Sequence, residues 1–267
     1  MINLEAPATR RAVFYYAASG AAAVVLGTKQ ALAQTRPAPK LDVIYVPTPQ
    51  VLVDRMLEMA EVKPTDFVMD LGCGDGRMIV TAARKYGTRG YGVDINPERI
   101  DEANASAKSA GVSDKVKFEV ANLFEQSMAK ADVLTMYLLP EINLKLRPKI
   151  LSEMKPGSRV ASHAFSMGDW AADADDVIEG KQIFLWYVPA TVQGRWKVEG
   201  ETDLSFDLTQ QFQMVMGTVT SNGNKSRVNG RLKGADITLN VEGRAQAMTG
   251  RVEGREIVGA NWRARQA

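Results

Sequence analysis

Residues 68–80 place a carboxylate and three closely spaced glycines within one short segment. The segment reads VMDLGCGDGRMIV, with Asp70 near the end of an apolar run and Gly72, Gly74 and Gly76 directly after it. The apolar run predicts a buried strand, the glycines predict a tight turn, and the apolar residues that follow predict the start of a helix. In many α/β proteins this order of elements binds a nucleotide-like cofactor.

The residues around the glycines exclude two common cofactor sites. A phosphate-binding P-loop requires a lysine and then a serine or threonine after its last glycine, and here Arg77 and Met78 follow Gly76. A dinucleotide fingerprint has the spacing G-x-G-x-x-G, whereas this turn has G-x-G-x-G. Asp70 would repel a pyrophosphate at the helix N-terminus and would suit a cofactor that bears an ammonium group. S-adenosylmethionine bears an ammonium group and a sulfonium.

The segment VMDLGCGDGR resembles motif I of the class I S-adenosylmethionine-dependent methyltransferases. The resemblance implies that Asp94, at the end of GYGVD, accepts hydrogen bonds from both ribose hydroxyls. It also implies that Asn122 lies near adenine N6, where the family usually has Asp; an Asn amide oxygen still accepts that hydrogen bond. The full set of cofactor-binding residues implied in this way is Tyr45, Thr48, Asp70, Gly72, Gly74, Asp75, Gly76, Asp94, Ile95, Asn122 and Leu123.

The segments that flank this motif resemble one subgroup of these enzymes. The subgroup contains the seven-strand protein-lysine methyltransferases that modify the ATP-synthase c-subunit and the ADP/ATP carrier in mitochondria, together with small prokaryotic relatives. The resemblance covers residues 43–170 and implies that Tyr45 and Thr48 fold over the cofactor. The segments that carry it are YVPTP, DLGCGDGR, YLLPEINLKLRPKI and PGSRVASHAFSMGDW.

Methyl transfer to a lysine requires a neutral amine aligned with the methyl carbon. A free lysine amine has a pKa of about 10.4, which a desolvated pocket beside a sulfonium lowers. Ligands bind at the carboxyl ends of parallel strands, so we expect Tyr137 to line the methyl-transfer pocket, with core packing as the alternative. Glu141 is a candidate to attract the amine or an ordinary helix-start glutamate. His163, the single histidine, is a candidate base or a structural residue of a core strand.

Strand and helix patterns alternate over residues 41–190 and predict an α/β domain with a doubly wound, Rossmann-like parallel sheet. Thr48 is expected to cap the first helix, with Pro49 as its first residue. Further helices are expected from the glycine turn to Gly87, after Asn96 and around 144–154, with a kink or a restart at Pro148. The expected strands are 67–71, 90–95, 115–120, 131–139, 158–165 and 181–189.

Residues 191–267 have no helical period and predict a small all-β domain at the C-terminal end of the sequence. Short alternating segments are separated there by Gly and Asn. NGRLKGADIT at 229–238 and TGRVEGREIV at 249–258 share Gly, Arg, Gly and Ile at an offset of 20 residues. This weak repeat predicts successive hairpins of a small barrel or sandwich. Trp196, Phe206, Phe212 and Trp262 are expected in its core.

Residues 1–33 have the features of an export signal. Arg10 and Arg11 precede an Ala/Gly-rich apolar run, and ALA precedes Gln34. This pattern predicts a cleaved Tat-like leader and a periplasmic or secreted protein. The alternatives are a membrane anchor, in which case an uncleaved leader is the only membrane contact, and a cytoplasmic protein with a basic N-terminus.

Composition limits the class of protein further. Hydrophobic residues make up 45% of the 267 residues and charged residues 24%, which is typical of a globular protein with a sizeable core. The formal charge of +2 gives no indication of a nucleic-acid partner. Cys73 is the single cysteine, so no internal disulfide forms. No cluster of His, Cys and carboxylate residues predicts a metal site.

Together these features predict a methyltransferase that uses S-adenosyl-L-methionine, with a protein lysine amine as the first candidate acceptor. The second candidate is a small molecule or an envelope lipid. A third hypothesis is a non-catalytic envelope module in which the methyltransferase scaffold is retained and the β-domain binds a partner. The intact turn from Asp70 to Gly76 and the presence of Asp94 argue against the third hypothesis.

Overall fold

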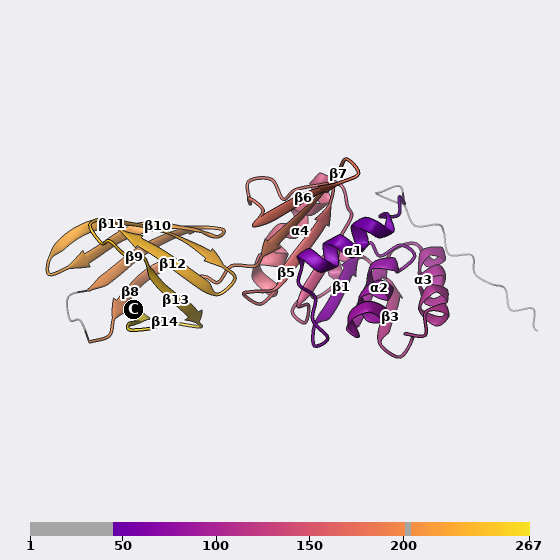
Figure 1. The fold of residues 1–267 in the computed structure, drawn as a ribbon, viewed down its shortest axis with the longest axis horizontal. Coiled ribbons are helices and arrows are strands. Elements are labelled where there is room, and N and C mark those ends of the chain that lie inside the picture. The colour runs from indigo at the N-terminus through magenta and orange to yellow at the C-terminus, as the bar shows by residue number, and fades with distance from the viewer. Residues whose placement is uncertain (1–44, 201–203) are drawn as a thin grey trace, which may run out of the picture. The chain divides into compact units, whose positions relative to one another are not determined.

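The computed structural model describes residues 45–200 and 204–267. The predicted export signal at residues 1–33 lies outside the described residues. Two sets of β-strands organise the described chain, a seven-stranded sheet with flanking helices and a closed β-barrel, and each is shown in Figure 1. Among the described residues, no helix combines the length and the apolar character that crossing a membrane requires.

The sheet has the strand order β3-β2-β1-β4-β5-β7-β6. Strands β1 to β5 pair in parallel, which confirms the predicted doubly wound, Rossmann-like arrangement. The chain order reverses between β1 and β4, and ligands of open α/β sheets bind at such a switch point, beyond the carboxyl ends of the strands. The strands are β1 Phe67–Leu71, β2 Arg89–Asp94, β3 Val116–Val120, β4 Val133–Met136, β5 Arg159–His163, β6 Ala174–Ile178 and β7 Lys181–Tyr187.

The prediction that the whole sheet is parallel is wrong at one edge. Strand β7 runs antiparallel to β5, and β6, which the sequence pattern did not reveal, runs antiparallel to β7. A parallel pair requires a crossover of a dozen or more residues, usually a helix, whereas a tight turn joins β6 directly to β7. Glu179 and Gly180 in that turn have φ angles of 51° and 72°, as in hairpin turns with two left-handed residues.

The helices cover both faces of the sheet. Buried side chains of α1, α2 and α3 pack with Val68, Val133 and Ala161 on one face. Buried side chains of α4 pack with Met69 and Leu134 on the other face. Alternate strand residues thus face opposite layers, which explains why these strands are apolar throughout. The helices are α1 Gln50–Met59, α2 Arg77–Tyr86, α3 Pro97–Ser109 and α4 Pro140–Glu153, with a short 3-10 helix η1 at Leu123–Glu125.

The expected Thr48 cap is wrong, the helix around Pro148 does not restart, and the expected Asn96 cap is confirmed. Helix α1 begins at Gln50 with Pro49 at the N-cap and no side-chain cap, because the Thr48 hydroxyl is engaged elsewhere. Pro148 lies inside α4, which continues to Glu153 without a restart. Asn96 caps α3 as expected, accepting a hydrogen bond from the backbone N–H of Glu98 at 2.9 Å.

The second set of strands closes into an eight-stranded antiparallel barrel, which resolves the choice between barrel and sandwich. The two repeat segments form the β11–β12 and β13–β14 hairpins, with Gly234 and Gly254 each at a φ of 63° in the turns. Trp196 and Phe206 are fully buried in the barrel core, whereas Phe212 and Trp262 are only half-buried. The strands are β8 Gly194–Val198, β9 Ser205–Gln211, β10 Met214–Ser221, β11 Asn224–Lys233, β12 Asp236–Val241, β13 Met248–Glu253, β14 Glu256–Gly259 and β15 Arg263–Gln266.

Candidate active site

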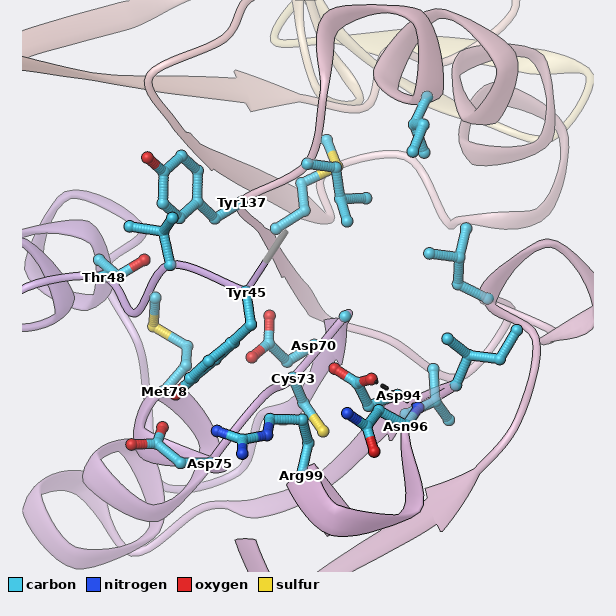
Figure 2. A pocket seen from close by; sticks show the side chains of 18 of the residues that line it. Tyr45, Thr48, Asp70, Cys73, Asp75, Met78, Asp94, Asn96, Arg99 and Tyr137 are labelled. Carbon is cyan, nitrogen blue, oxygen red and sulfur yellow. Dashed lines mark hydrogen bonds between the residues drawn. The ribbon is translucent and has the colours of Figure 1, made fainter. Parts of the chain in front are cut away.

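A cavity of about 520 Å³ lies at the carboxyl ends of the parallel strands, where the strand order reverses (Figure 2). Its volume is in the range of small-molecule and cofactor sites. Ten of the twelve predicted site residues line it: Tyr45, Thr48, Asp70, Gly72, Asp75, Asp94, Ile95, Asn122, Leu123 and Tyr137. Gly74 and Gly76 do not.

The glycine turn folds back onto β2. The N–H groups of Gly72 and Cys73 both donate to the carbonyl of Val93 at 2.9 Å. Gly72, Gly74 and Gly76 have φ angles of 75°, 51° and 75°, a backbone conformation in which glycine is strongly favoured. The alternate spacing of the three glycines therefore follows from the backbone, because every second residue of the turn adopts a left-handed conformation.

Gly74 and Gly76 are closely packed against other residues of the protein. A Cβ atom at Gly74 would lie 2.3 Å from Cε2 of Tyr45, so an aromatic ring of this chain covers that position. A Cβ atom at Gly76 would lie 2.7 Å from the ring of Phe118 and 2.8 Å from Ala103. Close packing within the protein therefore disfavours a side chain at both positions, and their predicted role in cofactor binding stays a prediction.

Asp70 is a buried carboxylate at the switch point. It pairs in register with Thr135 on β4, and the Thr135 hydroxyl donates to Oδ1 of Asp70 at 2.8 Å. Burial raises the pKa of Asp70 to about 7; the Thr135 hydrogen bond opposes this shift, and the nearby Asp94 and Asp75 add to it. Within the described residues no cationic side chain pairs with Asp70. This is a site where the charged carboxylate requires a cation from outside the protein.

Asp94 at the end of β2 is held by backbone donors. Its Oδ2 accepts from the N–H of Gly74 at 3.0 Å and its Oδ1 from the N–H of Asn96 at 2.9 Å. Each oxygen keeps a lone pair for a further donor. The carboxylate therefore has a fixed orientation in the cavity and can accept a pair of hydroxyl groups.

The segment of residues 45–48, called the arm below, lies across the cavity next to the glycine turn. The Arg99 guanidinium lies 4.5 Å from the centre of the Tyr45 ring, a cation–π geometry. The carbonyl of Thr48 accepts from Nη1 of Arg77 at 2.9 Å, and the Arg77 side chain also pairs with Asp75. The arm is thus fixed to the turn and to α3. Figure 2 shows the Tyr45 side chain beside Asp70 and Cys73.

Asn122 and Leu123 form the far wall of the cavity with η1. The Asn122 amide oxygen accepts from the N–H of Phe124 at 3.0 Å and so caps η1. Its amide nitrogen donates to Glu125 at 3.1 Å. The predicted acceptor oxygen for adenine N6 is therefore shared with a backbone donor, and its second lone pair is the one left for a ligand.

The opposite end of the cavity is aromatic and aliphatic. Tyr137 lies there, after β4, and is half-buried; its ring stacks at 6.3 Å on Phe165, which follows β5. Figure 2 shows Tyr137 and Thr48 on one side of Asp70, with Asp94 and Asn96 on the other. Glu141 is exposed and does not line the cavity. His163 is buried and lies behind this end, with its ring 3.8 Å from that of Tyr137.

The residues fit S-adenosylmethionine. The unpaired Asp70 carboxylate matches an ammonium group, Asp94 matches a ribose diol, and the apolar wall around Ile95 and Leu123 matches an adenine ring. Cys73 lines the cavity as a small buried residue, and burial raises the pKa of its thiol, which keeps it protonated. Within residues 45–200 and 204–267 no group of three or more His, Cys, Asp or Glu residues is arranged to hold a metal ion.

The remaining cavity residues were not predicted from the sequence. Arg77 and Met78 were noted only to exclude a P-loop, although a cationic residue directly after the glycine turn is a signal that the turn needs a counter-ion. Aliphatic residues after a strand carry no comparable signal. The cavity residues missed in this way are Val46, Pro47, Cys73, Arg77, Met78, Val93, Asn96, Arg99, Ala121, Phe124, Met136, Leu138, Leu139, Ile142 and Phe165.

The sheet order, the glycine turn and the two acidic strand ends define a class I S-adenosylmethionine-dependent methyltransferase. The ANTKMT methyltransferase domain matches residues 70–174. A protein-lysine N-methyltransferase of Saccharolobus islandicus is 48% identical over 127 residues, which are 47% of this chain and 79% of that protein. The chain belongs to this family of class I methyltransferases.

Two further relatives extend the comparison. An adenine nucleotide translocase lysine N-methyltransferase of Mus musculus is 33% identical over 132 residues, which are 49% of this chain and 57% of that protein. A crystal structure described as an RNA methyltransferase from Salinibacter ruber, in complex with S-adenosyl-L-homocysteine, has 47% sequence identity and a TM-score of 0.54. The matched region covers 55% of this chain and 96% of the Salinibacter ruber chain.

Proposed function

We propose that the protein transfers a methyl group from S-adenosylmethionine to the side-chain amine of lysine residues in a protein acceptor. The similarity to lysine methyltransferases supports the acceptor class. The observation that carries the proposal is the chemistry of the cavity: its acidic groups lie around the turn and Asp94, and its other end is formed by aromatic and aliphatic side chains. The residues at that end are Val46, Pro47, Tyr137, Leu138, Leu139, Ile142 and Phe165.

The apolar end suits the four-carbon stem of lysine and disfavours the charged form of its amine. Desolvation lowers the pKa of an amine, so a lysine that enters this end loses its proton to solvent more readily. Bound S-adenosylmethionine supplies an electrophilic methyl group, and S-adenosylhomocysteine leaves when the nitrogen–carbon bond replaces the carbon–sulfur bond. Tyr137 and Phe165 would hold the lysine stem in line, and alignment of this kind accounts for most of the acceleration expected of such a site.

A labelled-lysate experiment tests the acceptor class. Purified protein is incubated with a cell lysate and S-adenosylmethionine that carries a tritiated methyl group, and Asp70→Ala serves as a cofactor-deficient control. The proposal requires label that resists nuclease and organic extraction, disappears with protease and elutes as methyl-lysine after acid hydrolysis. Label removed by nuclease would assign an RNA acceptor, and label in the organic extract would assign a lipid or small molecule.

We also propose that residues 1–33 direct export, on the basis of Arg10, Arg11 and the ALA sequence before Gln34. Changing both arginines to lysine keeps the charge and the apolar run, so it separates receptor recognition from simple positive charge. Loss of periplasmic protein in this variant supports a Tat signal. Equal periplasmic amounts overturn it, and wild-type protein found only in the cytosol overturns export itself.

A further inference from the structure

The chain makes an uncommon turn directly after β5, at the acceptor end of the cavity. Ala164 has a φ of 66°, and the N–H of Phe165 donates to the carbonyl of His163 at 2.9 Å, which closes a three-residue turn. A left-handed alanine is strained, and such residues persist only where the surroundings enforce them. The residues on either side of this strained position are His163 and Phe165.

The surroundings of the turn enforce it from three elements. The Ser162 hydroxyl donates to the carbonyl of Phe165 at 2.8 Å, and the Asn143 amide on α4 donates to the same carbonyl at 3.2 Å. The N–H of Ala164 donates to the carbonyl of Gln182 on β7 at 2.7 Å. Ser162 and Asn143 are fully buried. The turn is therefore a rigid support for His163 and Phe165.

His163 connects two parts of the site that are distant in the sequence. Its Nδ1 lies 3.1 Å from Oγ1 of Thr48, within hydrogen-bond distance, and its ring lies against Tyr137. Thr48 is held at the same time by Arg77 through its carbonyl. Thr48 is therefore fixed from the cofactor side by Arg77 and from the acceptor side by His163.

The surroundings of His163 argue against a role as general base. The ring is 2% exposed and does not line the cavity. Burial, together with a smaller effect of the charge of Lys181, lowers the pKa of His163 to about 4. The imidazole is neutral at physiological pH, and both of its observed contacts are to protein groups that line the cavity, Thr48 and Tyr137.

We propose that His163 is a positioning residue for methyl transfer: it contacts both Thr48 on the arm and Tyr137, holds the two at a fixed separation, and so fixes the width of the acceptor end. This deepens the proposed function and rests on it for the acceptor used in the assay. The contact between Thr48 and His163 is the unit to be tested, because it can be removed from either side.

Three variants remove the contact and two serve as controls. Thr48→Val and His163→Phe each remove the hydrogen bond while keeping the shape of the side chain, and the double variant completes the cycle. Thr48→Ser restores the hydroxyl. Thr88→Val is the matched control, because Thr88 is a fully buried threonine whose hydroxyl has no hydrogen-bond partner in the structure and which does not line the cavity.

We expect each single variant to lower kcat/KM for the protein acceptor by about tenfold, the equivalent of one ordinary hydrogen bond. The dissociation constant of S-adenosylhomocysteine should change much less. The double variant should be no worse than the single variants, since both break one contact. Thr48→Ser and Thr88→Val should remain near wild type. Additive losses in the double variant, or no recovery with serine, would overturn the proposal.

Hydrogen exchange of the free protein gives a readout that does not depend on activity. The amides of Leu52 and Val53 donate to the carbonyl of Pro49, which directly follows the arm, and they should exchange faster in Thr48→Val and His163→Phe than in wild type and Thr88→Val. Unchanged exchange in both contact variants would also overturn the proposal. If wild type labels no lysine but the exchange differences appear, the acceptor assignment fails while the role of His163 in holding the arm stands.

Discussion

The hydroxyl of Thr135 donates to Oδ1 of Asp70 across neighbouring parallel strands, at 2.8 Å and at the same register position. This neutral donor is the hydrogen-bond partner that the described protein provides for a carboxylate buried at the centre of the site. A hydroxyl orients the carboxylate without neutralising it. The ammonium group of the cofactor is therefore the partner that the site lacks, and cofactor binding is coupled to the protonation of Asp70.

We expect S-adenosylhomocysteine to bind more tightly as the pH rises toward about 7 and then to level off, because Asp70 must ionise to face the ammonium group. Binding at about pH 6 should release protons, and binding at about pH 8.5 should not. Calorimetry in two buffers with different ionisation enthalpies measures this release. Asp70→Asn should bind weakly with no pH dependence, and wild-type pH dependence in that variant would contradict the assignment.

The same raised pKa sets the direction of the stability change in the free protein. The unfolded state loses the Asp70 proton near the ordinary aspartate pKa of 3.8, and the folded state keeps it until about pH 7. The contribution of Asp70 to stability is therefore full below pH 4 and is lost as the pH rises through about 7. Cofactor should raise the melting temperature more at about pH 8 than at about pH 5.

Thr135→Val should weaken cofactor binding near neutral pH, because the hydroxyl stabilises the charged form of Asp70 that faces the ammonium group. The loss should be roughly tenfold in affinity for each unit by which the pKa of Asp70 rises. Loss of the hydroxyl should also raise the pKa of Asp70 further, so the rise in affinity should move to higher pH. Titration of S-adenosylhomocysteine over a pH series measures both effects. Thr135→Ser keeps the donor and should restore the wild-type profile, whereas a profile unmoved in the valine variant would show that this hydroxyl does not act on Asp70.

Gly74→Ala and Gly87→Ala separate backbone strain from crowding of the arm. Both positions have a left-handed φ, 51° and 79°, so alanine costs each about 1 kcal/mol of stability. Space around Gly87 is open, whereas a Cβ at Gly74 meets Tyr45. We therefore expect loss of cofactor affinity in Gly74→Ala but not in Gly87→Ala.

The double variant Gly74→Ala/Tyr45→Ala isolates the clash itself. It should bind cofactor no more weakly than Tyr45→Ala alone, because the ring that the new methyl group would strike is absent. Isothermal titration of all four variants measures this. Equal affinities of wild type and Gly74→Ala would show that the arm moves aside without cost.

His163 should make the free protein less stable in acid. Its pKa of about 4 in the folded protein is below the ordinary histidine value of 6.5, so its contribution is full above pH 6.5 and is lost as the pH falls through about 4. The difference in unfolding free energy between wild type and His163→Phe should therefore shrink over this window, by up to about 3 kcal/mol. Urea unfolding at several pH values measures it, and a difference independent of pH would mean that His163 is solvated.

Local sequence patterns predicted most of the residues that line the cavity around the glycine turn and Asp94. The turn, Asp70 and Asp94 belong to one strand–turn–helix–strand unit, so their spacing in the sequence already places them close together in the fold. The acceptor half could not be predicted in this way. Thr48 and His163 are 115 positions apart, and no periodic pattern relates the end of β5 to the arm. Thr48 was predicted to cap a helix because threonine is a common N-cap residue. In the structure its hydroxyl instead lies within hydrogen-bond distance of His163.

The fold itself was predicted where hydrophobic runs were long and separated by helices. At the sheet edge β7 was predicted as a strand, but its antiparallel direction was not, because the strand that forms a hairpin with it was missed. That strand, β6, is Asp-rich and mostly exposed and so lacks an apolar run. The barrel was predicted as far as its hairpins, since Gly234 and Gly254 recur at equivalent turns. The closure of the barrel could not be predicted from the local sequence pattern, because it depends on pairing between β8 and β15, strands at opposite ends of the barrel sequence.

That closure changes how the last residues of this sequence should be handled in the laboratory. Arg263–Gln266 pair with β8 on one side and β14 on the other, and Ala264 is fully buried. Removing these residues would leave two strands with unpaired backbone edges, which invites aggregation. A reporter or purification tag fused directly after Ala267 would follow a structural strand without a spacer, so fusions at this end need a flexible linker, and a truncated clone is a poor negative control for any assay of this enzyme.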